Sequence, residues 1–231
     1  MAVNSRKRQL QKERKEKKRK EKKQQLARVL NAGIAERMRS AADYPVLHSW
    51  ISEMIGEQGI GSVLLSRELP GGRVAVAVFL VDRYCLGVKD GFGEVLGRAA
   101  YADKFERGIR EKDAARDAPP AEVCKLVRDA IDYAQALGIP PHPDAVKILP
   151  IFGSIDANEC KTVFEFGRDG KPFFMPGPYD TPERCRQIVA TLTSHCGPTG
   201  FDYAIPVSSQ FLSEGDEEFE EVEEFEDQIA D

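Results

Sequence analysis

Arg73-Val-Ala-Val-Ala-Val-Phe-Leu-Val81 is the stretch that decides the fold. Both alternating sets of its side chains are apolar, which is typical of a strand that is covered on both faces, or covered on one face while the other lines a groove. A second β-rich run, Ser62-Val-Leu-Leu-Ser-Arg67, precedes it across the turn signal Leu69-Pro-Gly-Gly72. The sequence therefore predicts a hairpin whose second strand is central in a sheet.

The stretch before the hairpin predicts two helices. An apolar face at helical spacing is formed by Leu26, Val29, Leu30, Ile34 and Met38. Tyr44-Pro45 is expected to end this helix, because the residue before a proline avoids the α region. A second, short helix is expected from Val46 to Ile55, where Leu47, Trp50, Ile51 and Met54 share one face.

The stretch after the hairpin alternates between irregular and helical patterns. Four glycines make Leu86 to Gly97 an expected irregular segment, and Glu94 to Arg110 is expected to include a helix. The clearest helix runs from Ala121 to Leu137, because Pro119-Pro120 opens it and Gly138 caps it.

The last third of the chain predicts a second hairpin, a helix and a short strand. The hairpin is expected to pair Lys161–Phe166 with Lys171–Met175, and Pro172 places the second of these at a sheet edge. Thr181-Pro182 is an N-cap followed by an N1 proline, which opens a helix to about Leu192. Phe201 to Ile205 is expected to be the short strand.

This order of elements favours an α+β fold with a mostly antiparallel sheet and packed helices. The boundaries are expected at residues 41 and 206, and about 165 residues suit one domain of ordinary size. A basic helical arm, residues 1–40, and a disordered acidic tail, residues 207–231, are expected to flank it.

The two ends of the chain carry opposite charges. Between Arg6 and Arg28 there are thirteen Lys and Arg against three Glu, and between Glu214 and Asp231 there are eleven Asp and Glu without a Lys or Arg. The formal net charge of -5 therefore does not reveal that one end of the chain is strongly basic and the other strongly acidic. The arm is expected to be a marginal helix in isolation, since its basic stretch lacks an apolar face and its charges repel.

Such an arm is typical of non-catalytic proteins that bind nucleic acid or ribonucleoprotein through phosphates. Lysine predominates and aromatic residues are absent, which predicts contact with the phosphate backbone rather than with bases. The alternative is a solvated arm that only confers solubility. The candidate contacts are Arg6, Lys7, Arg8, Lys12, Arg14, Lys15, Lys17, Lys18, Arg19, Lys20, Lys22 and Lys23.

The acidic tail suggests a regulatory role or a partner of its own. Phe211, Phe219, Val222 and Phe225 are interspersed with its acids, a mixture typical of disordered recognition segments. We expect it to dock on a basic partner or on the arm of the same chain, in which case it would inhibit binding of nucleic acid.

Composition also bears on the compartment. The five cysteines are scattered, without a C-x-x-C pair, which argues against a disulfide framework and favours a reducing compartment. Neither a membrane span nor a signal peptide is predicted, because apolar runs are short and the N-terminal segment is charged. We therefore expect a cytoplasmic protein.

The alternative function is that of an enzyme of unknown reaction. Asp82, Tyr84, Cys85 and Lys89 lie close together after the apolar strand, and loops at strand ends carry much catalysis. The structural interpretation is favoured: Asp82 caps the turn, Tyr84 and Cys85 belong to the core, and Lys89 is a solvated cation.

The remaining candidate motifs are incomplete, and neither a metal nor a cofactor is expected. His142-Pro-Asp144 and His195-Cys196 lack further ligands for a metal. The glycines between Gly87 and Gly93 do not have the spacing of a phosphate-binding loop. Phe173 and Phe174 are expected to pack in the core rather than to stack on bases.

Three segments resemble an uncharacterised family of bacterial proteins. They are Phe79-Leu-Val-Asp-Arg-Tyr-Cys-Leu-Gly-Val-Lys-Asp90, Phe164-Glu-Phe-Gly-Arg-Asp-Gly-Lys-Pro-Phe-Phe174 and Gly177-Pro-Tyr-Asp-Thr-Pro182. The resemblance covers roughly residues 44 to 205 and also includes Tyr133 to His142. It implies no activity, and the arm and the tail lie outside it.

Overall fold

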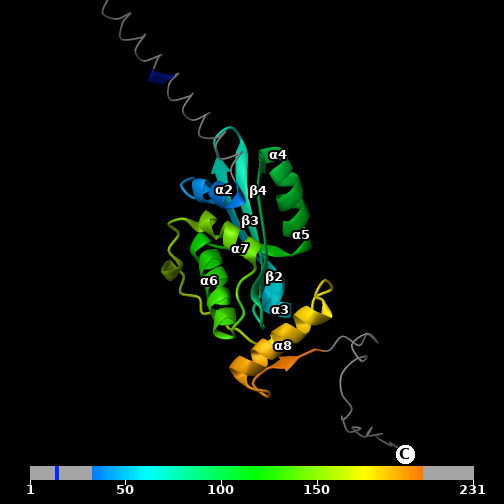
Figure 1. Ribbon diagram of the computed structural model, residues 1–231. Helices are drawn as coiled ribbons and strands as arrows, with labels where there is room; N and C mark the ends of the chain where they lie inside the picture. The colour runs from blue at the N-terminus through cyan, green and yellow to red at the C-terminus, as the bar shows by residue number, and fades with distance from the viewer. Residues whose placement is uncertain (1–13, 16–32, 205–231) are drawn as a thin grey trace, which may run out of the picture.

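The predicted hairpin forms the centre of a five-stranded antiparallel sheet. The computed structural model describes residues 14–15 and 33–204 (Figure 1). Its five main strands lie in the order β4-β3-β2-β1-β5. Their bounds are β1 Val46–Ser52, β2 Ile60–Leu69, β3 Arg73–Asp82, β4 Gly87–Gly97 and β5 Ala115–Asp117. Each neighbouring pair is antiparallel, which confirms the α+β fold with a mostly antiparallel sheet.

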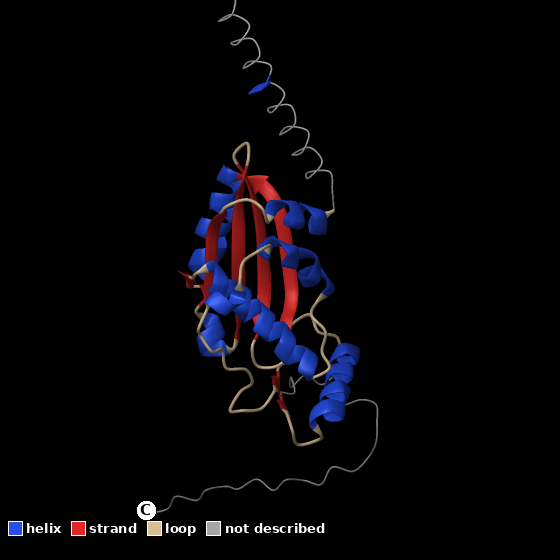
Figure 2. Ribbon diagram, turned by 90° about the vertical axis from the view of Figure 1, so that its left-hand side faces the viewer, coloured by secondary structure: helices blue, strands red, loops and turns tan. Residues whose placement is uncertain are grey.

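Strand β3 is covered on both faces, which is the first of the two alternatives that its sequence allows. Ala75, Ala77 and Phe79 belong to the core on one face, whereas Val74 and Val76 belong to a separate core on the other. Figure 2 shows the sheet enclosed between helices on its two sides. The hairpin register, with ten residue pairs from Ile60↔Asp82 to Leu69↔Arg73, is continuous.

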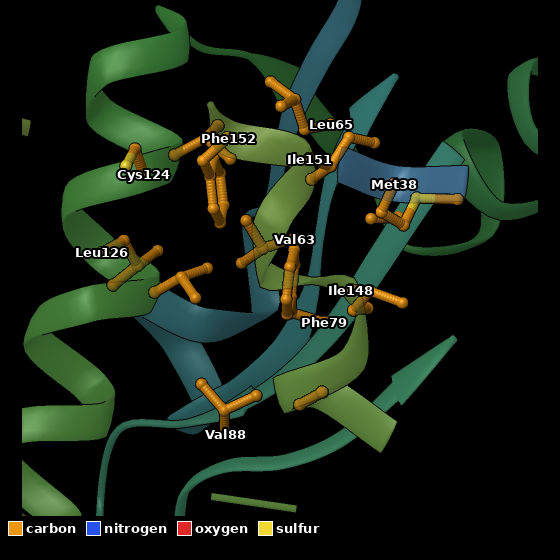
Figure 3. Packing of buried hydrophobic residues seen from close by; sticks show 14 of the residues in the cluster. Met38, Val63, Leu65, Phe79, Val88, Cys124, Leu126, Ile148, Ile151 and Phe152 are labelled. Atoms are coloured by element: carbon orange, nitrogen blue, oxygen red, sulfur yellow. The ribbon is translucent and has the colours of Figure 1, made fainter. Parts of the chain in front are cut away.

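The first face carries the larger core (Figure 3). Phe79 of β3 stacks on Phe152 with a distance of 5.4 Å between ring centroids. The covering elements are α2 Ile34–Ala41, α6 Pro120–Ala136, α7 Pro143–Ile148 and the 3-10 helix η2 Leu149–Phe152. Pro120 occupies the first turn of α6, which confirms the predicted helix. Met38 and Ala41 of α2 are fully buried, so the folded unit includes a segment that the sequence assigns to the arm.

Arg67 ties the sheet to two distant segments of this layer. It is only 6% exposed, and its guanidinium donates to the carbonyl oxygens of Tyr44, Ile151 and Phe152 at 2.6 Å, 2.8 Å and 2.9 Å. Burial lowers its pKa. These three bonds fix both the segment that enters β1 and the end of η2 against β2.

The second face is covered by one continuous helical segment. It consists of α4 Arg98–Tyr101, the π-helix η1 Ala102–Ile109 and α5 Arg110–Lys112, and it includes the helix predicted between Glu94 and Arg110. Tyr101 and Phe105 are fully buried and stack on each other at 5.5 Å. The segment crosses the sheet and leads into β5, which pairs with β1 on the side away from β2.

A third cluster forms at the opposite end of the sheet from α2 (Figure 1). It contains α8 Pro182–Cys196 and the parallel pair β6 Phe173–Phe174 and β7 Asp202–Tyr203. The hydroxyl of Thr181 accepts from the main-chain N–H of Arg184, as its predicted role of N-cap requires. The short 3-10 helix η3, Ala157–Glu159, lies in the connection that leads to this cluster.

Three expectations for the middle of the chain are wrong. Val46 to Ile55 is mainly strand β1, and only α3, Met54–Gln58, is helical. Pairing of this segment with β2 outweighs the helical spacing of its apolar residues. In the strand, Trp50 and Ile51 lie on opposite faces of the sheet.

The segment Leu86 to Gly97 is strand β4 rather than irregular. Its glycines allow helices to approach the strand: a Cβ on Gly91 would lie 2.4 Å from Cα of Ala145 in α7. Of the hairpin expected between Lys161 and Met175, only the turn forms, with an isolated bridge between Arg168 and Lys171. The expected second strand instead contributes β6, which pairs with β7.

The close approach of α7 to β4 predicts a difference between two glycine substitutions. Gly91→Ala should lower the free energy of unfolding by about 1–3 kcal/mol, because the added methyl group meets the backbone of Ala145. Gly97→Ala in the same strand is the matched control, since a Cβ there meets nothing within 4 Å. Urea denaturation measures both, and equal stabilities would contradict the packing described.

Candidate functional site

The strand-end turn that the alternative of an enzyme would use has a structural role. The Oδ1 atom of Asp82 accepts hydrogen bonds from the main-chain N–H groups of Tyr84 at 2.9 Å and Cys85 at 3.1 Å. Asp82 is 6% exposed, and burial raises its pKa. The carboxyl group thus caps the turn, as the structural interpretation expects.

Cys85 and Tyr84 connect this turn to the C-terminal cluster. Cys85 is fully buried, and burial, with a contribution from Asp82, raises the pKa of its thiol to about 12. The carbonyl oxygen of Tyr84 accepts from the N–H of Phe173 at 3.0 Å and from the hydroxyl of Tyr133 at 3.2 Å. A buried, protonated thiol is a poor nucleophile.

Lys89 is not the solvated cation expected from the sequence. Its side chain is 15% exposed, and Nζ lies 3.9 Å from Oδ2 of Asp180, which is 10% exposed. The same carboxylate accepts from the N–H of Gly177 at 2.7 Å and pairs with Arg184 at 3.0 Å. Lys89 therefore helps to hold the loop before α8 against β4.

The other candidate motifs are also engaged in local structure. Nδ1 of His142 accepts from the N–H of Asp144 at the start of α7, and Nδ1 of His195 lies 2.9 Å from the carbonyl oxygen of Thr191. In the described part of the chain, no three His, Cys, Asp or Glu side chains gather as metal ligands would. Phe174 is 1% exposed, as expected of a core residue, whereas Phe173 is only partly buried and has the Arg168 guanidinium over its ring.

A polar cluster that the sequence did not indicate surrounds His48 in β1. Nδ1 of His48 lies 3.0 Å from the hydroxyl of Tyr101, which lies 2.9 Å from Oγ of Ser66. The same Nδ1 is 3.5 Å from Oε1 of Glu106. The ring of Trp50 stacks on the imidazole with 5.4 Å between centroids, and the ring of Tyr101 lies at 5.7 Å and nearly parallel to it.

These contacts assign the proton positions. An unprotonated Nδ1 would direct its lone pair at a carboxylate, so we place the proton on Nδ1 and the lone pair on Nε2. Tyr101 then donates to Ser66, and Ser66 donates to the carbonyl oxygen of His48 at 3.3 Å. Burial raises the pKa of Tyr101 to about 12, so it remains a phenol.

The charge state of His48 follows from its burial. Burial is the main cause that lowers its pKa below the ordinary 6.5, with Arg98 and Arg110 acting in the same direction. Glu106 and Asp117 oppose this shift. The imidazole is therefore neutral at pH 7 and offers Nε2 as a hydrogen-bond acceptor.

Two irregularities of the backbone meet at this histidine. The register of β1 against β2 shifts between Val46 and His48, which inserts Leu47 as a bulge. The π-helix η1 carries Glu106 to the same place. Bulges and π-helical turns are both enriched next to functional sites, where they redirect side chains.

Buried polar atoms of this cluster are incompletely paired. Among the described residues, Nε1 of Trp50 and Oε1 of Glu106 are buried without a hydrogen-bond partner, although Glu106 also lies 3.4 Å from Arg98. A shallow hollow of about 320 Å³, wide open to solvent, lies beside His48 at the edge of the sheet. It is lined by Val46, Leu47, His48, Ser49, Asp117, Ala118 and Pro119.

The arm predicted to bind nucleic acid lies mostly outside the described residues. Of its candidate contacts, Arg14 and Lys15 are described, and both are helical and exposed. The remaining ten, together with the stripe at Leu26, Val29 and Leu30 and the acidic tail, lie outside the described part and stay predictions.

No match to the chain was found among protein-family models, curated proteins or solved structures. The resemblance to an uncharacterised bacterial family therefore stays a prediction. Within the described residues, no helix has the length and apolar character that a membrane span requires.

The enclosure of Cys85 predicts its reactivity. In the native protein at pH 8, iodoacetamide should modify the partly exposed Cys160 while Cys85 stays unmodified, because its thiol is buried and protonated. Mass spectrometry of tryptic peptides measures both, and denaturation in urea should make both react. Native modification of Cys85 as fast as that of Cys160 would contradict its structural role.

Proposed function

We propose that this protein binds nucleic acid or ribonucleoprotein through its basic arm, without catalysis at the strand-end turn. The observation that carries the proposal is the charge of the arm, thirteen Lys and Arg against three Glu between Arg6 and Arg28. Such a density of cations neutralises phosphates and releases their counterions, whatever the base sequence.

The anchoring of α2 supports this role. Met38 and Ala41 are fully buried against the sheet, so the arm emerges from a helix that is fixed to the domain. Because α2 belongs to the folded unit, a polyanion bound to the arm is tethered to that unit. The enclosed Asp82 and Cys85 give no comparable support to an enzyme at that turn.

We also propose that the protein works in the cytoplasm and that its acidic tail competes for the arm. All five cysteines are free thiols, which suits a reducing compartment. The tail carries eleven acids on the same chain as the arm, and a tethered competitor acts at high effective concentration.

Removal of the arm should abolish binding. A protein of residues 33–231 keeps α2, and fluorescence anisotropy with a labelled oligouridylate compares it with the full chain at low salt. If the arm contacts about five phosphates, a rise from about 50 to 200 mM salt should weaken binding by the full chain about a hundredfold. A chain with the arm residues in shuffled order is the matched control, and it should bind like the natural chain.

Equal binding by the full chain and by residues 33–231 would contradict the proposal. That result would favour an arm that serves only solubility.

Removal of residues 214–231 should tighten binding. Without the tail, the arm no longer has an intramolecular competitor, and the gain should be largest at low salt, where charges are least screened. The same anisotropy titration measures the dissociation constant. Identical constants with and without the tail would refute inhibition by the tail.

A further inference from the structure

The hollow beside His48 combines hydrogen-bond acceptors with an apolar lining. Nε2 of His48 and the carboxylate of Asp117 are the acceptors, and the apolar lining comes from Val46, Leu47, Ala118 and Pro119. Ser49 adds little, because its hydroxyl donates to the carbonyl oxygen of Ala118 at 2.5 Å. The hollow therefore suits a ligand with hydroxyl donors and a carbon framework.

The orientation of His48 follows from its neighbours. Nδ1 is engaged by Tyr101 and Glu106, and the ring of Trp50 stacks on the imidazole. Nε2 has no hydrogen-bond partner among the described residues and is not one of the buried unpaired polar atoms, so the exposed 27% of the side chain includes it. The acceptor is held in place by the surrounding contacts before a ligand arrives.

Asp117 is also positioned. Its Oδ2 pairs with Nη2 of Arg110 at 2.7 Å, and the Arg110 guanidinium lies over the Trp50 ring at 5.0 Å. Trp50 is in turn stacked on His48, so one set of contacts orients both acceptors.

The charges around the hollow do not favour a phosphate. Each nearby arginine faces an acid: Arg98 pairs with Glu106, Arg110 with Asp117 and Arg116 with Glu122. The hollow thus offers recognition of neutral hydroxyl groups, whereas the charge that attracts a polyanion is in the arm.

We propose that this hollow binds the ribose of RNA, with Nε2 of His48 accepting a hydrogen bond from a 2′-hydroxyl and Asp117 accepting from a neighbouring one. This inference rests on the proposed function, since the arm supplies the affinity. The 2′-hydroxyl is the group by which a protein distinguishes RNA from DNA at a given site. The hollow therefore makes the protein selective for RNA.

Four residues separate the end of α2 from the start of β1. The arm joins α2 at its other end, where Ile34 packs beside Gly93 of β4, so a single strand held by the arm must cross the width of the sheet to reach the hollow at the edge of β1.

The test compares labelled oligouridylate and oligodeoxyuridylate of about 20 nucleotides, which differ only in the 2′-hydroxyl groups. The full natural chain should bind the RNA about three- to tenfold more tightly, the effect of one or two hydrogen bonds. His48→Phe keeps a ring beside Trp50 and Tyr101 but removes one of the two acceptors, so its preference for RNA over DNA should fall. Affinity for DNA should stay unchanged.

Asp117→Asn provides a second variant, because the Asp117 side chain is 73% exposed and its replacement leaves the core intact. It should reduce the preference for RNA. Asp103→Asn is the matched control, since Asp103 is an exposed acid that also pairs with an arginine, Arg107. It should keep the full preference.

The outcomes separate the two proposals. Equal affinity of the natural chain for RNA and DNA would overturn the ribose site and leave the proposed function standing. An unchanged preference in both His48→Phe and Asp117→Asn would also overturn the site. Binding of neither oligonucleotide would refute the proposed function, and the ribose site with it.

Discussion

Burial of β3 on both faces is the constraint on which the rest of the structure depends. A strand that is apolar from Val74 to Val81 must be covered on both faces, and two separate layers of helices cover it. The helical segment of the second layer crosses the sheet to β5, which brings Tyr101 and Glu106 over His48. The polar cluster is thus a consequence of how the second face is covered.

Local signals were sufficient for some elements and insufficient for others. Proline at N1, glycine after the C-terminus and the apolar period identified α6, and an N-cap identified α8. β1 was missed because Leu47, Trp50, Ile51 and Met54 fit a helix as well as a strand until β2 supplies a partner. β4 was missed because its glycines serve the approach of a helix, which is a tertiary contact.

The candidate site shows the same limit. The sequence suggests a site where four polar residues lie close together, namely Asp82, Tyr84, Cys85 and Lys89. In the structure they belong to a turn that anchors the C-terminal cluster. His48, Ser66 and Tyr101 are far apart in the chain and meet only through strand pairing and the crossing helix. His48 is a single histidine in a segment that the sequence predicts to be helical, so the sequence does not indicate this cluster. The two proposals therefore assign different roles to different parts of the chain. The arm is proposed to supply affinity for a polyanion, and the edge of β1 to select RNA over DNA.

Ultraviolet crosslinking of the full-length protein to oligouridylate, followed by mass spectrometry of the crosslinked peptides, tests this division most directly. We expect crosslinks in peptides from the arm between Arg6 and Arg28, and a second group from the edge formed by β1 and the segment around Asp117. Crosslinks confined to other surfaces, with none in the arm, would contradict it.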